Sequence, residues 1–310
     1  MNKPASSLTE QDFVRLPADR SMADAIVRPS VSYWRDVLRR IRSDKVAIVS
    51  LTFLVIIILM AIFAPILSPY GYETTDLLHT NQPPSAEHWF GTDDLGRDLF
   101  ARVFQGGRVS LTIGIVGAVV ASVVGSIYGG IASYFGGIVD DIMMRIVEVL
   151  LSIPYLLTVI LISVVTDSKS IGTMMLALVL TGWCGIARLV RGQMLQLKSQ
   201  EYILAANALG VSPIKTIMRH MIPNTLGMII VAITFDIPGY IFSEAFLSYV
   251  GLGVQPPDTS WGALASAAQQ NFMFYPYQLF FPSLMIALTM LGFTLLGDGL
   301  RDALDPKLRK

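Results

Sequence analysis

The segment Glu201-Tyr-Ile-Leu-Ala-Ala-Asn-Ala-Leu-Gly-Val-Ser-Pro-Ile-Lys-Thr-Ile-Met-Arg-His-Met-Ile-Pro-Asn224 connects two hydrophobic stretches, yet it predicts ordered structure. Residues 201–209 are good helix formers, and Gly210 stands where a helix often ends in a left-handed glycine. Ser212-Pro213 then supplies an N-cap and a proline at the first helical position, and Pro223 marks the next boundary. We therefore predict two short helices that meet at an angle on the water side of a membrane, a shape suited to docking.

The composition is that of a membrane protein. Hydrophobic residues make up 53% and charged residues 15% of the 310 residues, and the mean hydropathy is +0.57. Soluble domains carry about 25% charged residues. The formal net charge of zero gives no reason to expect a nucleic-acid partner. The single cysteine, Cys184, excludes an intrachain disulfide framework and is expected to be a small buried residue.

Apolar runs of about 20 residues predict six membrane-spanning helices. The fold class is therefore all-α, one integral-membrane helical bundle. No cleavable signal peptide is expected, because the first apolar run starts only near Val46 and no small-residue cleavage site follows. The predicted spans are 46–67, 109–134, 144–166, 171–189, 222–247 and 279–297.

Lysine and arginine positions predict the orientation, because cytoplasmic loops are enriched in them. They gather before residue 46, between residues 188 and 219, and after residue 300, whereas the opposite side has only Arg97, Arg102, Arg108 and Lys169. Arg145 is assigned to a short turn between spans two and three. The predicted layout is a cytoplasmic tail (1–45), a first span (46–67), an outer loop (68–108), a five-helix transmembrane domain (109–298) with a cytoplasmic loop at about 190–221, and a cytoplasmic C-terminal tail (299–310).

Span two carries small residues at a spacing of four: Ala121, Gly125, Gly129 and Ser133. Such a stripe lets another helix approach closely. It is equally consistent with packing inside this chain and with contact to a partner subunit.

Span five contains Asp236, Pro238 and Glu244, which are unusual inside a membrane. Proline within a span predicts a kink, and an ionisable residue at membrane depth usually faces a cavity or a bundle interior. These residues predict a water-accessible path lined by span five. The alternative is a structural hydrogen bond from a protonated Asp236 to a neighbouring helix.

The outer segments are rich in turn-forming and aromatic residues. Residues 88–98 read His-Trp-Phe-Gly-Thr-Asp-Asp-Leu-Gly-Arg-Asp, which predicts a turn whose aspartates cap the next helix. The nearly uncharged loop 251–262 predicts an interfacial re-entrant or short amphipathic segment. Trp261, Tyr275 and Tyr277 are expected to anchor the chain at the membrane surface.

The sequence lacks the motifs of common enzymes. It has no Gly-x-x-x-x-Gly-Lys-Ser/Thr phosphate loop, no His-Glu-x-x-His or Cys/His metal cluster and no Gly-x-Ser-x-Gly elbow. His79, His88 and His220 fall on both sides of the predicted membrane and cannot share one site. We predict a protein that is not an enzyme by itself and holds no metal or cofactor.

Four segments together resemble one family, the permease subunits of bacterial ATP-binding-cassette importers, and within it the C-type permeases of the dipeptide, oligopeptide and nickel group. The paired alanines Ala205-Ala206 before Gly210 are similar to the cytoplasmic EAA loop of these importers. The other three resembling segments are 88–98, 244–262 and 298–306. The loop departs from the family pattern at two positions: Leu204 stands where a glutamate usually precedes the alanines, and His220 stands at a usual isoleucine position. Coupling is therefore not predicted to depend on the charge of a glutamate before the alanines.

The resemblance implies a type I importer fold, with a cytoplasmic coupling helix that docks in a groove of an ATPase. It implies a second homologous permease, two ATPase subunits that hold ATP and Mg²⁺, an extracytoplasmic substrate-binding protein, and a bacterial inner membrane location. The helix spacing places Tyr202, Ala205, Ala206 and Leu209 on one contact face, and Gly210 allows the turn. The full set of predicted coupling residues is Glu201, Tyr202, Ala205, Ala206, Leu209, Gly210, Ser212 and Pro213.

Three questions stay open from the sequence. Peptides are the expected substrates, but similar permeases carry nickel, glutathione or other small solutes. A helix pair lying on lipid is the alternative to a docking loop. An ion-gradient-driven transporter using Asp236 and Glu244 is the rival of another class, although no inverted repeat is evident.

Overall fold

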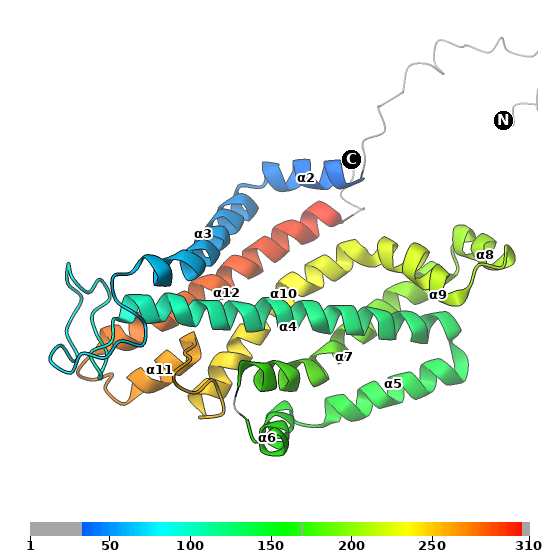
Figure 1. The fold of residues 1–310 in the computed structure, drawn as a ribbon. Helices are drawn as coiled ribbons and strands as arrows, with labels where there is room; N and C mark the ends of the chain where they lie inside the picture. The colour runs from blue at the N-terminus through cyan, green and yellow to red at the C-terminus, as the bar shows by residue number, and fades with distance from the viewer. Residues whose placement is uncertain (1–32, 169, 306–310) are drawn as a thin grey trace, which may run out of the picture.

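The computed structural model describes residues 33–168 and 170–305, and within them the chain is almost entirely helical. A single isolated bridge between Thr92 and Asp98 is its only β-type pairing in these ranges. Figure 1 shows the bundle, with the outer loop and α11 at one end and α8 at the other. The helices are α2 (Tyr33–Ser43), α3 (Lys45–Leu67), α4 (Leu99–Phe135), α5 (Gly137–Ser152), α6 (Tyr155–Thr166), α7 (Ile171–Lys198), α8 (Glu201–Ala208), α9 (Pro213–Thr216), α10 (Ile222–Tyr249), α11 (Trp261–Gln269) and α12 (Pro276–Leu304), with a π turn at Ile217–Met221.

Five helices of the described chain are long and apolar enough to cross a membrane, and a bent pair makes a sixth if it is counted as one span. The five are α3, α4, α7, Pro213–Tyr249 and α12. The bent pair is α5 and α6, which meet at 85°. A continuous third span over 144–166 is therefore a wrong prediction. Pro154 removes a backbone donor and pushes Ile153 into an extended conformation, which ends α5.

Most helices continue past the apolar runs that predicted them. Helix α4 begins at Leu99 rather than residue 109, and α7 and α12 extend to Lys198 and Leu304. Arg145 lies within α5 rather than in a turn. The tail expected before residue 46 includes the helix α2, while its first 32 residues and residues 306–310 lie outside the described part. Hydropathy detects only the lipid-depth portion of a helix, so the polar turns at each end were missed.

Helix α4 is the central element, and its most extensive packing is against α7 (Figure 1). The small-residue stripe on α4 forms this contact. A Cβ atom added to Gly125 would come within 2.6 Å of the Trp183 carbonyl oxygen, and one on Gly129 would collide with the Ala187 carbonyl. Ala121 and Ser133 are fully buried on the same helix. Of the two readings open from the sequence, the structure uses the stripe for packing inside this chain.

Helices α3 and α4 are joined by hydrogen bonds to backbone carbonyls, one of which a proline leaves without its helix donor. Pro65 lies inside α3 and cannot donate to the carbonyl of Ala61. Arg108 of α4 donates from Nε to that carbonyl oxygen at 2.7 Å, and its Nη2 donates to the carbonyl of Ile62. The arginine thus holds the outer part of α3 against α4.

The long helix that contains α10 is continuous through Pro223, where a boundary was expected. The helical segment runs from Pro213 to Tyr249, and Pro238, where a kink was expected, lies inside it. The π turn precedes Pro223, with the Ile222 amide bonded to the Ile217 carbonyl, and Asn224 Nδ2 donates to the His220 carbonyl at 2.6 Å. These bonds satisfy backbone groups around the proline. The second short helix of the predicted pair is therefore the first turn of this long helix, not a separate element.

Candidate functional site

Helix α8 ends in a Schellman turn built on Gly210. The Val211 amide donates to the Ala206 carbonyl and the Gly210 amide donates to the Asn207 carbonyl. Gly210 has φ +73°, a conformation that costs a residue with a side chain about 1–2 kcal/mol. Pro213 occupies the first turn of α9, as predicted. Ser212 is at the N-cap position, but its side chain makes no capping hydrogen bond.

One face of α8 packs on its own bundle. Ile203 and Ala206 are buried, and Ile203 belongs to an apolar cluster with Val190 and Met194 of α7 and Met221 of the π turn. At the edge of this contact, Tyr134 Oη of α4 donates to Asn207 Oδ1 at 3.0 Å. Helix α8 is therefore fixed to α4, α7 and the base of α10.

The other face of α8 is exposed and apolar. Tyr202, Leu204 and Leu209 are 43%, 55% and 84% exposed, and Glu201 and Ala205 are exposed beside them. The predicted contact face is wrong at Ala206, which faces the bundle, and it omitted Leu204. The helical spacing of the buried Ile203 and Ala206 could have revealed the inward face from the sequence.

The ends of α4, α5 and α7 beneath α8 are held by polar contacts. Asp140 of α5 receives two hydrogen bonds from the guanidinium of Arg191, a bidentate pair. Lys198 Nζ donates to the Ser133 carbonyl at 3.3 Å, which ties the end of α7 to the end of α4. These bonds connect α5 to α7, and α7 to α4.

A cavity of about 550 Å³ lies between α7 and α10. Asp236 lines it, whereas Pro238 and Glu244 do not. Pro238 is buried, so the three predicted path residues do not share one surface. Hydroxyl-bearing residues that the sequence reasoning did not single out line the same cavity. They are Tyr155, Thr181, Tyr240 and Ser243.

Glu244 is fully buried and hydrogen-bonded. Ser110 Oγ of α4 donates to Glu244 Oε2 at 2.7 Å, and Ser248 Oγ donates to Oε1 at 2.8 Å. Ser110 Oγ also accepts from the Trp261 amide at 3.2 Å. Glu244 therefore joins α4, α10 and the start of α11 instead of facing a water-accessible path.

The segment 68–98, predicted from the lysine and arginine positions to lie on the outer side and called the outer segment for that reason, is organised by buried polar pairs. Asp98 caps α4 by accepting from the Ala101 amide at 2.8 Å, as the sequence predicted for its aspartates, and its other carboxyl oxygen is 2.9 Å from His88 Nδ1. Asp93 accepts from the backbone amides of Leu95 and Arg97 and from Arg97 Nε at 2.7 Å. The segment is a folded cap on the bundle.

Trp261 contradicts its predicted place in the aromatic belt. It is fully buried, and its Nε1 donates to the Val103 carbonyl at 2.8 Å. Gly106 and Gly107 make room for it, since a Cβ on Gly107 would lie 3.0 Å from the indole. Tyr277 Oη donates to the Thr92 carbonyl at 3.2 Å, so this tyrosine ties α12 to the outer segment. The loop 251–262 leads into α11, which packs on α12, α10 and α4.

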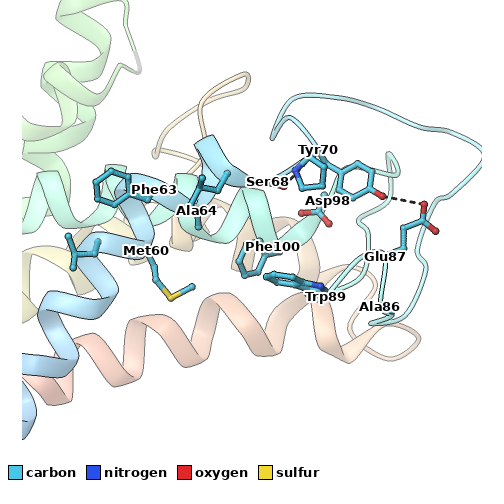
Figure 2. Close-up of a pocket in the computed structure, with 13 residues that line it drawn as sticks. Met60, Phe63, Ala64, Ser68, Tyr70, Ala86, Glu87, Trp89, Asp98 and Phe100 are labelled. Carbon is cyan, nitrogen blue, oxygen red and sulfur yellow. Dashed lines mark hydrogen bonds between the residues drawn. The ribbon is translucent and has the colours of Figure 1, made fainter.

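A second cavity, of about 600 Å³, lies between the outer end of α3 and the outer segment. Figure 2 shows its apolar side chains, including Met60, Phe63, Trp89 and Phe100, with a hydrogen bond from Tyr70 to Glu87 at its edge. None of the predicted path or coupling residues lines this cavity.

Two family profiles match the chain. One is described as "Binding-protein-dependent transport system inner membrane component" and matches residues 121–310. The other is described as "N-terminal TM domain of oligopeptide transport permease C" and matches residues 32–84.

Curated relatives align over nearly the whole chain. The oligopeptide transport system permease protein OppC of Bacillus subtilis is 51% identical over 96% of this chain and 97% of its own length. The dipeptide transport system permease protein DppC of the same organism is 48% identical over 98% and 95%. A glutathione transport system permease protein, GsiD of Escherichia coli, is 40% identical over 89% and 91%.

A solved structure has the same fold over most of this chain. It is the inward-facing MetNI methionine ABC transporter, with a TM-score of 0.54 and 18% identity. The match covers 66% of this chain and 96% of the transporter chain. At that identity the match supports the type I importer fold and no more.

Proposed function

Because the chain belongs to the family of binding-protein-dependent transport system inner membrane components, we propose that it is one of two permeases forming the membrane path of an ATP-driven peptide importer. Membership makes the chain a multi-pass membrane permease, a transport component rather than an enzyme. The observation that carries the peptide assignment is the 51% identity to an oligopeptide permease over 96% of the chain. A glutathione permease at 40% supports the same chemical class, since glutathione is itself a peptide.

In this proposal the chain works within a larger assembly. A second permease closes the path, two ATPase subunits bind ATP and Mg²⁺, and an extracytoplasmic binding protein delivers the substrate. The chain lies in a bacterial inner membrane with both termini in the cytoplasm, as its lysine and arginine distribution suggests. No nucleic acid takes part.

The exposed face of α8 is the proposed ATPase contact. Leu209, Leu204 and Tyr202 are large apolar side chains left uncovered on a short, well-anchored helix. Since α8 is packed against α7 and the base of α10, a movement of the ATPases would be transmitted to the helices that line the Asp236 cavity. Alternating access would then follow from rigid-body motion of these helices.

The test is reconstitution of all the subunits in liposomes, followed by measurement of peptide uptake with and without ATP. ATP-dependent uptake that needs the binding protein supports the proposal. Uptake driven by an ion gradient, in liposomes holding this chain alone, would contradict it and support the secondary transporter.

A pair of leucine variants tests the coupling face within the same assembly. Leu209→Asp is expected to abolish co-purification with the ATPases, because a charge would enter an apolar contact. Leu78→Asp is the matched control: Leu78 is 90% exposed in the outer segment and should leave co-purification unchanged. Equal co-purification of the two variants would remove α8 from the contact.

A further inference from the structure

Two carboxyl groups on α10 have opposite surroundings. Glu244 is enclosed by α4, α10 and α11 and accepts hydrogen bonds from serine hydroxyls. Asp236 has no hydrogen bond or ion pair with any of residues 33–168 and 170–305, and it lines the 550 Å³ cavity. It lies near the middle of Ile222–Tyr249, about 20 Å from either end at 1.5 Å per residue. An ionisable side chain at that depth is costly and usually marks a substrate or ion pathway.

The walls of the cavity supply hydroxyl groups, one carboxyl group and no positive charge. Its lining residues include no Lys, Arg or His, and Asp236 is the only charged one. Tyr240 is nine-tenths buried, and its hydroxyl has no hydrogen-bond partner among the described residues. Gly185 and Gly239 leave the surface open, since a Cβ at either would meet nothing within 4 Å. The site is therefore negative, hydroxyl-rich and accessible.

Resting on the proposed function, we infer that the Asp236 cavity binds the positively charged amino terminus of the transported peptide. An ammonium group has three donors and no acceptor, and the Asp236 carboxylate accepts only, while the hydroxyl oxygens of Thr181 and Ser243 can accept as well. Binding would give the membrane-depth carboxylate the counter-charge that the described part of this chain does not provide.

A metal ion fits the cavity less well than an organic cation. Hard cations take about six or more oxygen ligands, usually with several carboxylates. The described residues contain no group of three or more His, Cys, Asp or Glu side chains that could hold a metal. The apolar walls from Leu178, Ile186 and Phe235 suit the remainder of a peptide.

Protection from a carbodiimide tests the inference directly and without the binding protein. The two permeases and the ATPases are assembled in lipid nanodiscs and treated with a membrane-permeant carbodiimide, and modification of Asp236 is followed by mass spectrometry. Tri-alanine at about ten times its dissociation constant is expected to slow modification about tenfold, because only the unoccupied site reacts. N-acetyl-tri-alanine, which lacks the ammonium group, should leave the rate unchanged. Equal protection by both peptides, or by neither, would overturn the inference.

Uptake by variants gives a second measurement. Asp236→Asn should lower ATP-dependent tri-alanine uptake about tenfold to a hundredfold, whereas Asp236→Glu should keep most of it. Ser243→Ala removes an uncharged group from the same cavity and should cost less than Asp236→Asn. Asn and Glu variants with equal uptake would contradict the inference. Failure of the proposed function would give a different result, because the unaltered complex would then transport no peptide. The protection experiment would still decide whether Asp236 binds an ammonium group.

Discussion

The two ends of the molecule differ in how their polar and apolar side chains are arranged. At the outer end, polar side chains of the outer segment and of α11 are paired within the chain: His88 with Asp98, Asp93 with Arg97, and the Trp261 indole with a backbone carbonyl. At the other end, α8 leaves large apolar side chains in the open, with Leu209 84% exposed. Apolar exposure alone does not distinguish the two ends, because Leu78 of the outer segment is 90% exposed. The outer end differs in its buried polar pairs, whereas the apolar face beside α8 is the surface proposed to contact a partner.

This difference separates two kinds of mutational effect. Changes in the outer segment and α11 remove contacts that already exist and should lower the free energy of unfolding. Changes on the exposed face of α8 remove contacts that form only in the assembly and should spare the isolated chain.

The largest effect is expected from Trp261→Ala. Trp261 is fully buried against Gly106 and Gly107 and donates to the Val103 carbonyl, so truncation leaves a cavity and removes that hydrogen bond. A loss of about 3–5 kcal/mol is expected for such a change. Thermal unfolding of the purified chain in detergent measures it. The control is Leu209→Ala in α8, and a similar fall in both variants would break the comparison.

A smaller loss of unfolding free energy is expected from Asp98→Ala. This change removes the N-cap of α4 and leaves His88 Nδ1 without its buried partner. The combined cost should be about 2–3 kcal/mol. Asp98→Asn keeps an oxygen for the Ala101 amide and should recover part of the loss in the same unfolding measurement. If Asp98→Asn were as damaging as alanine, the cap would not be the source of the stability.

Gly210→Val should act on transport more than on stability. Valine at φ +73° is strained by about 1–2 kcal/mol, and the strain falls on the Schellman turn that directs α8. Membrane insertion should be retained while ATP-dependent uptake is lost. Gly210→Asn is the matched control, because asparagine tolerates the left-handed region. Normal uptake by the valine variant would show that the turn geometry is not required for coupling.

The sequence predicted elements whose signal is local. The α8 terminus at Gly210, the proline start of α9 and the Asp98 cap were all predictable, because each depends on a few neighbouring residues and a backbone rule. The apolar runs likewise located the membrane helices.

Features that depend on tertiary contacts could not be predicted. Trp261 reads as a membrane-surface anchor until Gly106 and Gly107 of another helix are seen to enclose it. Glu244 reads as a path residue until Ser110, far away in the sequence, is found beside it.

The smallest change in stability is expected within the outer segment. Asp76 and His79 form an exposed pair at 2.7 Å, in contrast to the buried pair of Asp98 and His88. The hydrogen bond to Asp76 raises the pKa of His79, and the bond to His79 lowers the pKa of Asp76.

The direction of each shift sets the pH range of this exposed pair. The raised His79 pKa gives stabilisation that is complete below the unfolded value of about 6.5 and is lost as pH rises through the folded value. The lowered Asp76 pKa gives stabilisation that is complete above about 3.9 and is lost as pH falls through its folded value. The pair therefore stabilises the folded chain between the folded pKa of Asp76 and the folded pKa of His79. Asp76→Asn should lower the His79 pKa toward its ordinary value in an NMR titration. Because both side chains are in water, the unfolding midpoint should hardly move. A large change in that midpoint would show that an exposed pair in this segment can contribute as much stability as a buried one. Burial would then not explain any larger contribution from Asp98 and His88.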